Sequence, residues 1–347
     1  MRSQQEERNI MSASQHGAIS RRGFVRRIGG VAGTAAFGAT GTALGAEAGS
    51  SPGELPRRTL GKTGLSVTTM CLGTAPCGIA KSISPRQVAE IVNAGLDLGI
   101  NIVDTSEKYG NAEEGVGLAL GPRRKDILLA TKVWADTVEE AEKKLANSFK
   151  KLKTDYADVL YFHHLGERDV QRAREPDGVF TWLVKQKKAG RCRFLGISGH
   201  NLPGRFPPFL QTGEVDVMLV AMNFGDRHTY NFEETVLPVA RKHEVGVIAM
   251  KVFGAPDPDT GSWGNPKAKP NVGEENVEMA IRYALSLPGV ASANLGVHTV
   301  EQLRENVEIV KRFEPLSADE QARLLPLGKK LAKKWEEHFG PVTEEAV

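Results

Sequence analysis

The sequence has few of the residues that stabilise small exported or metal-binding proteins. Of its 347 residues only three are cysteines, Cys71, Cys77 and Cys192, and no two of them form a CxxC pair. Three cysteines cannot build a disulfide framework, so an apolar core has to hold the fold together. Hydrophobic residues make up 40% of the chain and charged residues 25%, which suits a soluble protein with one large domain or two small ones.

Outside the amino terminus the chain has no excess of charge of either sign. Residues 1–48 hold six arginines against three glutamates, and this difference equals the whole formal net charge of +3. The remainder of the chain is therefore neutral. A neutral body without a basic stripe argues against nucleic-acid binding, because such surfaces need a clustered positive field.

The first 48 residues show the pattern of an export signal. Residues 20–26 read SRRGFVR and precede a run at 28–46 that is rich in Gly, Ala and Thr but poor in Leu. This arrangement resembles a twin-arginine signal, and the leucine-poor run predicts no stable membrane span. Residues 46–48 offer a cleavage site, and a disordered basic tail is the alternative interpretation. We therefore expect the twin-arginine translocation machinery to export the folded protein to the periplasm, or another extracytoplasmic location, of a bacterium.

From residue 67 onward, short β-branched apolar runs alternate with segments of helical periodicity. This alternation is typical of a parallel sheet built from βα units. Eight units in about 260 residues match the size of one closed (β/α)8 TIM barrel, and an open doubly wound sheet is the alternative. The eight runs are 67–72, 100–103, 127–131, 159–162, 194–197, 217–221, 247–250 and 293–296.

Capping signals and loop composition complete the predicted organisation. Ser84 and Ser317 each begin a capping box that predicts a helix start, and Pro326 should interrupt the second of these helices. Residues 254–273, rich in Pro and Gly, form a long loop of the kind that is either a functional lid or disordered. The predicted segments are a signal at 1–48, a linker at 49–56, the barrel at 57–316 and a helical extension at 317–347.

Polar side chains stand at the ends of several predicted strands. The active site of a β/α barrel lies at the carboxyl ends of its strands, so these residues are candidates for catalysis. Taken singly, each also fits an ordinary role such as a helix cap or a solvated charge. The candidates are Asp104 and Tyr109 after the second strand, Lys132 after the third, His163 and His164 after the fourth, Ser198, His200 and Asn201 after the fifth, and Asn223 after the sixth.

Four of these residues would form a tuned general acid if they converged. The pKa of a tyrosine is ordinarily about 10, and the ammonium of Lys132 would lower it for Tyr109. The carboxylate of Asp104 would keep Lys132 charged at the mouth of an apolar barrel. A neutral His163 could donate a hydrogen bond to a substrate oxygen. The set predicts proton transfer to a carbonyl group.

The same region carries a resemblance to a known family. Residues 103–110, VDTSEKYG, resemble the aldo-keto reductase signature, in which an Asp-Thr pair precedes a Tyr-Gly pair. The resemblance runs from RTLGKTGL at 58–65, which looks like the hairpin that closes the barrel floor in that family, to EQLREN at 301–306. It implies a barrel that binds NADPH, less often NADH, and passes hydride to an aldehyde or ketone.

The resemblance also assigns roles within the site. The motif match implies that Tyr109 is the proton donor and that Lys132 and Asp104 adjust its pKa. It also implies that His163 orients the substrate. His164 falls one position past the family's histidine and is interpreted as a residue of the substrate pocket or its surroundings. The cofactor contacts that the resemblance implies are Thr74, Asp104, Ser198, Asn223, Met250, Lys251, Phe253, Gly296, His298, Gln302 and Asn306.

Some family positions carry unusual residues here. Where the family has an Asn beside the serine, this chain has Gly199, and where it has a Gln on the sixth strand, this chain has Leu219. Met250 stands at the position of the aromatic residue that stacks on the nicotinamide in the family. These departures concern the nicotinamide contacts and leave the four catalytic candidates intact.

The resemblance favours NADP(H) over NAD(H). A 2′-phosphate normally meets Lys or Arg, and here His298 occupies one implied position, so Arg304, Lys267 or Lys269 would have to supply the charge. Gln302 also completes a possible capping box, which is an ordinary structural role. No cysteine follows Cys192, so an iron–sulfur cluster of the kind some relatives carry is not expected. We expect no metal cofactor either.

Two other functions fit parts of the pattern. A catalytically weak barrel that binds nicotinamide as a sensor or structural part would tolerate the altered contacts, but the four intact catalytic candidates argue against it. A metal-dependent hydrolase could use Asp104, His163, His164 and His200, but the His-x-His pair expected after the first strand is missing. We therefore expect an enzyme acting on a small-molecule carbonyl substrate.

Overall fold

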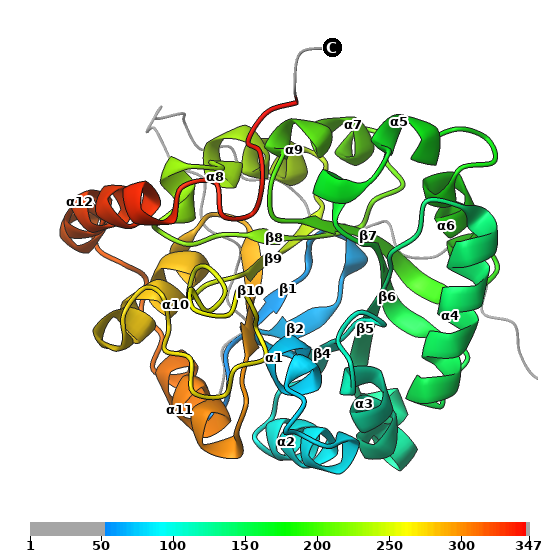
Figure 1. Ribbon diagram of the computed structural model, residues 1–347, viewed down its shortest axis with the longest axis horizontal. Helices are drawn as coiled ribbons and strands as arrows, with labels where there is room; N and C mark the ends of the chain where they lie inside the picture. Colours follow the sequence, from blue (N-terminus) through cyan, green and yellow to red (C-terminus); the bar gives the residue numbers. More distant parts are fainter. Residues whose placement is uncertain (1–52, 345–347) are drawn as a thin grey trace, which may run out of the picture. The chain divides into compact units, whose positions relative to one another are not determined.

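The computed structural model describes residues 53–344, so the expected signal at 1–48 lies outside the described residues. Eight parallel strands close into a barrel in the order β10-β3-β4-β5-β6-β7-β8-β9 (Figure 1). Because β10 pairs with β3, the sheet has no free edge; the prediction of a (β/α)8 barrel is confirmed and the open-sheet alternative is wrong. The strands are β1 (Arg57–Thr59), β2 (Ser66–Thr68), β3 (Met70–Gly73), β4 (Ile102–Asp104), β5 (Leu128–Val133), β6 (Ala157–Phe162), β7 (Cys192–Gly199), β8 (Val217–Ala221), β9 (Gly246–Met250) and β10 (Val290–Gly296).

Helices surround the barrel (Figure 1) and bury their apolar faces against it. The capping boxes predicted at Ser84 and Ser317 are both present, each with its side chain bound to the backbone N–H three residues on. The helices are α1 (Ala75–Ile79), α2 (Pro85–Asp97), α3 (Ala112–Leu120), α4 (Val138–Leu152), α5 (Val170–Ala173), α6 (Val179–Lys188), α7 (Pro207–Leu210), α8 (Phe232–Thr235), α9 (Leu237–Lys242), α10 (Val277–Ser286), α11 (Val300–Lys311) and α12 (Ala318–Trp335).

The first predicted strand, at 67–72, is in fact two elements. Residues up to Thr68 belong to β2, which pairs antiparallel with β1, whereas β3 enters the barrel. Between them the N–H of Thr69 bonds to the carbonyl of Pro56 at 2.8 Å, which turns the chain from the hairpin into the barrel. Leu60, at the turn of this hairpin, is fully buried at the amino-terminal end of β9, against Gly246. The hairpin therefore closes the barrel floor.

The helix α12 runs through Pro326 without interruption, so the predicted break is wrong. Proline removes one backbone hydrogen bond, but α12 packs against its neighbours on both sides of Pro326, and the helix continues. Leu324 is buried before it, and Gly328 lies so close to the carbonyl of Phe224 that a side chain there would collide with it.

The interior of the barrel is packed with side chains. Leu219 and Met250, which stand where the family places a Gln and an aromatic residue, belong to this inner cluster. Tyr161 on β6 is fully buried, and its ring fills the space over Gly196 that a Cβ would need. This filled interior leaves the carboxyl ends of the strands as the place for a cavity.

None of the helices among residues 53–344 has the length and apolar character needed to cross a membrane.

Candidate active site

Four of the predicted site residues come together at the carboxyl ends of β4, β5 and β6. The ammonium of Lys132 lies 2.6 and 2.8 Å from the two carboxylate oxygens of Asp104 and donates a third hydrogen bond, of 2.7 Å, to the carbonyl of Thr105. The same nitrogen lies 4.7 Å from the centre of the Tyr109 ring, and that ring lies 6.0 Å from the imidazole of His163, edge to face. The ion pair is therefore built into the wall beside the phenol.

Burial dominates the electrostatics of this group. Burial raises the pKa of Tyr109 above its usual value, and the opposing effect of the Lys132 charge is smaller. This corrects the expectation that Lys132 lowers the pKa outright, because the phenol is enclosed as well as close to a cation. Burial acts to lower the pKa of Lys132, but Asp104 and Tyr109 outweigh it and raise that pKa. At neutral pH the site holds a protonated phenol beside a charged ammonium.

The imidazole of His163 is neutral and fixed in orientation. Burial, assisted by the charge of Lys132, lowers the pKa of His163 well below its usual value. Its Nδ1 lies 3.3 Å from the hydroxyl of Ser106, and the ring of Trp134 packs against it edge to face at 5.3 Å. With Nδ1 facing Ser106, Nε2 is the nitrogen that can address a substrate oxygen.

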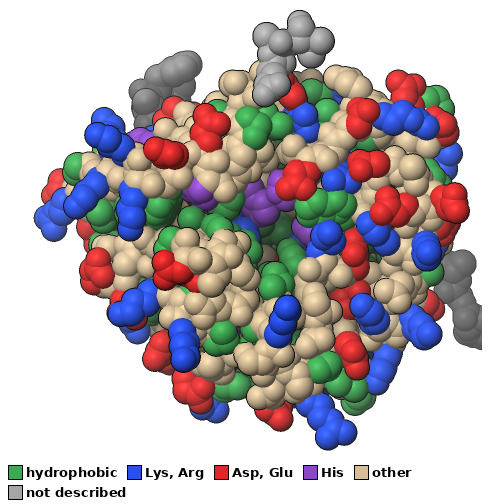
Figure 2. All heavy atoms as spheres, viewed as in Figure 1, with side chains coloured by type: hydrophobic (Ala, Val, Ile, Leu, Met, Phe, Trp, Pro, Cys, Tyr) green, Lys and Arg blue, Asp and Glu red, His purple; other side chains and the backbone are tan. Residues whose placement is uncertain are grey.

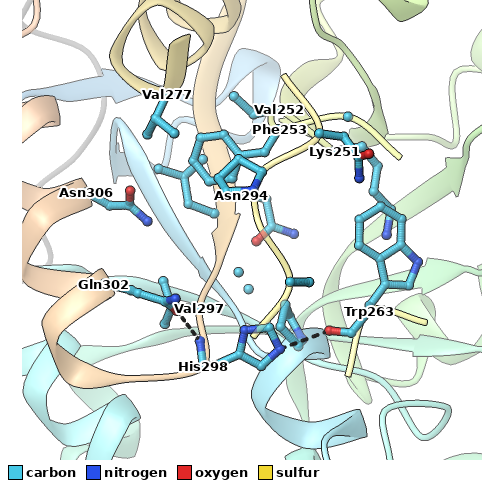
Figure 3. Close-up of a pocket in the computed structure, with 18 of the residues that line it drawn as sticks. Lys251, Val252, Phe253, Trp263, Val277, Asn294, Val297, His298, Gln302 and Asn306 are labelled. Atoms are coloured by element: carbon cyan, nitrogen blue, oxygen red, sulfur yellow. Dashed lines mark hydrogen bonds between the residues drawn. The ribbon is translucent and has the colours of Figure 1, made fainter. Parts of the chain in front are cut away.

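A cavity of about 950 Å³ opens beside these groups, between β9, β10, α1 and α11. Figure 3 shows Asn306 and Gln302 on one side of it and Trp263 on the other. Nine of the predicted site residues line it: Asp104, Tyr109, Met250, Lys251, Phe253, Gly296, His298, Gln302 and Asn306.

Five predicted residues do not line this cavity: Thr74, Lys132, His163, Ser198 and Asn223. Three of them hold backbone in place. Thr74 donates to the carbonyl of Asp104 at 2.9 Å, and Ser198 accepts from the N–H of His164 at 3.2 Å. The amide of Asn223 donates to the carbonyl of Lys251 at 2.9 Å and its oxygen accepts two backbone N–H groups. These three side chains therefore fix the backbone at Asp104, His164 and Lys251.

Lys251 has an unusual environment for a lysine. It adopts the left-handed region at φ 58°, held there by Asn223 and by the N–H of Gly254, both of which donate to its carbonyl. Its ammonium lies 3.6 Å above the centre of the Trp263 ring. Burial, together with the nearby charge of Lys132, lowers the pKa of Lys251 to about 7. No carboxylate among the described residues comes within ion-pair distance of it, so its charge is available to an anion.

Asn294 also lines the cavity, although it is not among the site residues that the sequence predicts. Its amide donates to Asp104 at 3.1 Å, while its oxygen is buried without a hydrogen-bond partner, next to Gly73. The residue lies in the middle of β10, where the run 293–296 was interpreted only as a strand. The one feature of the sequence that could have indicated a role for Asn294 is its polar side chain within an otherwise apolar strand.

A second group of histidines lies next to His163. Nδ1 of His200 is 2.9 Å from Nε2 of His164, and the ring of His200 stacks on Phe339 at 5.0 Å. Burial lowers the pKa of both His164 and His200, so the pair is neutral. Figure 2 shows histidine side chains gathered in the hollow at the centre of this face. Within residues 53–344 no group of three His, Cys, Asp or Glu side chains could hold a metal ion.

The chain is similar to several known oxidoreductases. The sequence profile of the aldo/keto reductase family matches residues 69–257. L-galactose dehydrogenase of Arabidopsis thaliana is 28% identical over 297 residues, which cover 76% of this chain and 91% of the plant protein. An uncharacterized oxidoreductase of Bacillus subtilis is 29% identical over 73% of this chain and 90% of its own length.

Solved structures share the fold. An aldo-keto reductase of Bacillus halodurans in its holo form superimposes with a TM-score of 0.64 at 24% identity, over 83% of this chain and all (100%) of that one. An aldo/keto reductase of Klebsiella pneumoniae in complex with NADPH gives 0.62 at 22% identity, over 78% and 95%. With the family profile covering more than half of the chain, this protein belongs to the aldo/keto reductase family of NAD(P)-dependent oxidoreductases.

Proposed function

We propose that this protein reduces an aldehyde or ketone to an alcohol, with a nicotinamide dinucleotide as hydride donor and Tyr109 as proton donor. The observation that carries the proposal is the Asp104–Lys132 ion pair placed against the Tyr109 ring at the wall of a large cavity. The intact group favours a working enzyme over a sensor that only binds the dinucleotide.

The protonation states suit this role. A buried phenol keeps its proton at neutral pH, so Tyr109 is ready to donate when negative charge develops on the carbonyl oxygen. The adjacent ammonium of Lys132 then stabilises the phenolate that remains. The neutral His163 donates a hydrogen bond that orients the carbonyl.

The cavity fits a dinucleotide. It has the volume of a cofactor site, about 950 Å³, and the ammonium of Lys251, which has no ion-pair partner among the described residues, suits a pyrophosphate. When bound, the dinucleotide supplies the hydride. The Klebsiella relative was solved with NADPH, which supports NADP(H) here.

Arg304 is the best candidate for the 2′-phosphate that distinguishes NADP(H) from NAD(H). It is exposed at the cavity, on the same helix as Gln302 and Asn306. Two other cations that line the cavity, Lys269 and Arg312, already pair with Glu274 and Glu278. We propose a small carbonyl compound or the matching alcohol as the physiological substrate; the plant relative is named L-galactose dehydrogenase.

For location, we propose export by the twin-arginine translocation machinery, with residues 1–48 as the signal. The paired arginines Arg21 and Arg22, and the leucine-poor run behind them, support this proposal.

Replacing Tyr109 by Phe tests the proposed function. The Tyr109→Phe variant should bind the dinucleotide as wild type does but reduce a test aldehyde at least about a hundredfold more slowly, because a general acid is lost. Tyr156→Phe is the matched control, since Tyr156 packs under Arg124 away from the cavity. Reduction by Tyr109→Phe at close to the wild-type rate would rule out this assignment.

A further inference from the structure

The two histidines beside His163 form a hydrogen-bonded pair that the proposed proton transfer does not use. His164 follows β6 and His200 follows β7, and because these parallel strands are neighbours, both residues reach the same rim. Nδ1 of His200 lies 2.9 Å from Nε2 of His164, and the rings meet edge to face at 4.6 Å. This contact occupies one nitrogen of each ring.

The backbone of His164 is held in a conformation that is rare for residues other than glycine. Its φ is 62°, in the left-handed region. The hydroxyl of Ser198 accepts a hydrogen bond from its N–H at 3.2 Å, and its carbonyl accepts one from the N–H of Glu167 at 3.0 Å. Strained residues of this kind gather at functional sites. The surrounding structure therefore fixes the position from which the ring of His164 meets His200.

The pair is neutral at neutral pH. Burial lowers the pKa of His200 well below its usual value, and the charge of Lys251 is the next cause. Burial also lowers the pKa of His164, against the opposing charge of Glu167. The Glu167 carboxylate lies 3.6 Å from Nε2 of His164, but its side chain is 51% exposed, so water screens its charge. The pair therefore attracts neither anions nor cations by charge of its own.

A neutral pair can offer either hydrogen-bonding role to a ligand. In each neutral ring one nitrogen carries the hydrogen and the other accepts. If His164 donates to His200, Nε2 of His200 carries a hydrogen and is a donor; if His200 donates to His164, the same Nε2 is an acceptor. A hydroxyl group both donates and accepts, so it satisfies either arrangement, whereas a carboxylate only accepts and an ammonium only donates.

The pair lies close to the place where His163 would hold a carbonyl oxygen. The ring centres of His163 and His164 are 6.5 Å apart, and Trp134 packs against both, at 5.3 and 5.5 Å. Nδ1 of His164 is enclosed, whereas Nε2 of His200 is not, and it makes no hydrogen bond with residues 53–344. Nε2 of His200 is therefore the atom of the pair that a ligand in the histidine-lined hollow (Figure 2) reaches.

We propose that the His164–His200 pair selects carbonyl substrates that carry a hydroxyl group several bonds away from the reacting carbonyl. The proposal rests on the proposed function and adds a specificity-determining contact to it. The remote hydroxyl binds Nε2 of His200 while His163 orients the carbonyl oxygen. A substrate with an alkyl group at that place displaces water and leaves the nitrogen without a partner, which disfavours it.

The test compares aldehydes that differ in one group. Full-length protein with NADPH is given para-methylbenzaldehyde, para-(hydroxymethyl)benzaldehyde and para-carboxybenzaldehyde, and then the three meta-substituted counterparts, and kcat/KM is measured for each. The groups are similar in size, but one is apolar, one donates and accepts, and one is an anion. We expect the wild-type protein to prefer hydroxymethyl over methyl by about tenfold in at least one set, the scale of a neutral hydrogen bond.

Two variants place this preference on the pair. His200→Phe keeps a ring beside Phe339 but removes both nitrogens, so the ratio of hydroxymethyl to methyl kcat/KM should fall to about one. His164→Asn removes the ring that fixes His200, and Asn tolerates the left-handed backbone, so the ratio should fall there too. His243→Phe is the matched control and should keep the wild-type ratio, because His243 lies between α9 and β9 at the opposite end of the barrel.

The outcomes separate the two proposals. A wild-type ratio of about one in both sets, or a wild-type ratio in either His200→Phe or His164→Asn, would overturn the role of the pair. A preference for carboxylate over hydroxymethyl would overturn it as well, since selection would then belong to the nearby cations. A protein that reduces none of the aldehydes would instead contradict the proposed function.

Discussion

The buried ion pair between Lys132 and Asp104 offers the sharpest stability test. Lys132 is 1% exposed and Asp104 3%, and the ammonium makes three hydrogen bonds of 2.6 to 2.8 Å. Removing one partner of such a pair costs about 3–5 kcal/mol of unfolding free energy, because the other charge stays buried and unpaired. We expect Lys132→Met to cost about 3 kcal/mol at pH 8 on this basis.

The pH dependence of this loss has a definite sign. Burial already raises the pKa of Asp104 in the wild-type protein, and without Lys132 only the hydrogen bond of Asn294 and the charge of Lys251 oppose that effect. The folded variant then holds the carboxyl protonated, whereas the unfolded chain releases the proton with a pKa of about 3.9. A folded pKa above the unfolded one means that stability is lost as pH rises between the two values. The penalty of Lys132→Met should therefore be larger at pH 8 than at pH 5.

Urea unfolding followed by tryptophan fluorescence at both pH values measures this difference. The double variant Asp104→Asn with Lys132→Met should recover much of the loss, since replacing a whole buried pair by neutral groups is often close to neutral. Lys188→Met, at an exposed lysine on α6, controls for loss of a positive charge. A loss below about 1 kcal/mol at pH 8, or a loss that shrinks as pH rises, would refute the reasoning.

Three further outcomes are expected. Arg304→Ala should weaken NADPH binding about tenfold while leaving NADH binding unchanged, in calorimetric titrations; equal effects on both would remove Arg304 from the 2′-phosphate site. Because burial lowers the pKa of Lys251 to about 7, its ammonium loses charge above that pH, and dinucleotide affinity should fall between pH 6 and pH 8. In Lys251→Met that fall should vanish, and an unchanged pH profile would argue against a phosphate contact. Arg21→Lys combined with Arg22→Lys keeps the positive charge but should leave folded, untrimmed protein in the cytoplasm, detected by fractionation and mass determination; normal export would show that the paired arginines are incidental.

Local sequence patterns were sufficient to predict the architecture. Alternating apolar runs predicted the barrel strands, and the serines at 84 and 317 predicted helix starts that the structure contains. The four catalytic candidates were also visible, because strand ends in a barrel face a common rim. Each of these patterns involves residues that lie within one helical turn or one strand. They can therefore be recognised from the order of the residues alone.

Contacts between distant residues decided the rest. Asn294 meets Asp104 across 190 positions of the chain, and Trp263 meets His298 across 35. Whether Pro326 breaks a helix depended on how closely α12 packs against the barrel. The net direction of the Tyr109 pKa shift likewise followed from its burial, which no spacing of residues reveals. The sequence by itself determined which elements form and which chemical groups reach the rim. Only the tertiary structure decided how those groups are buried and paired. The exposure of each side chain to water, and its distance from side chains far away in the sequence, depend on the closed barrel as a whole.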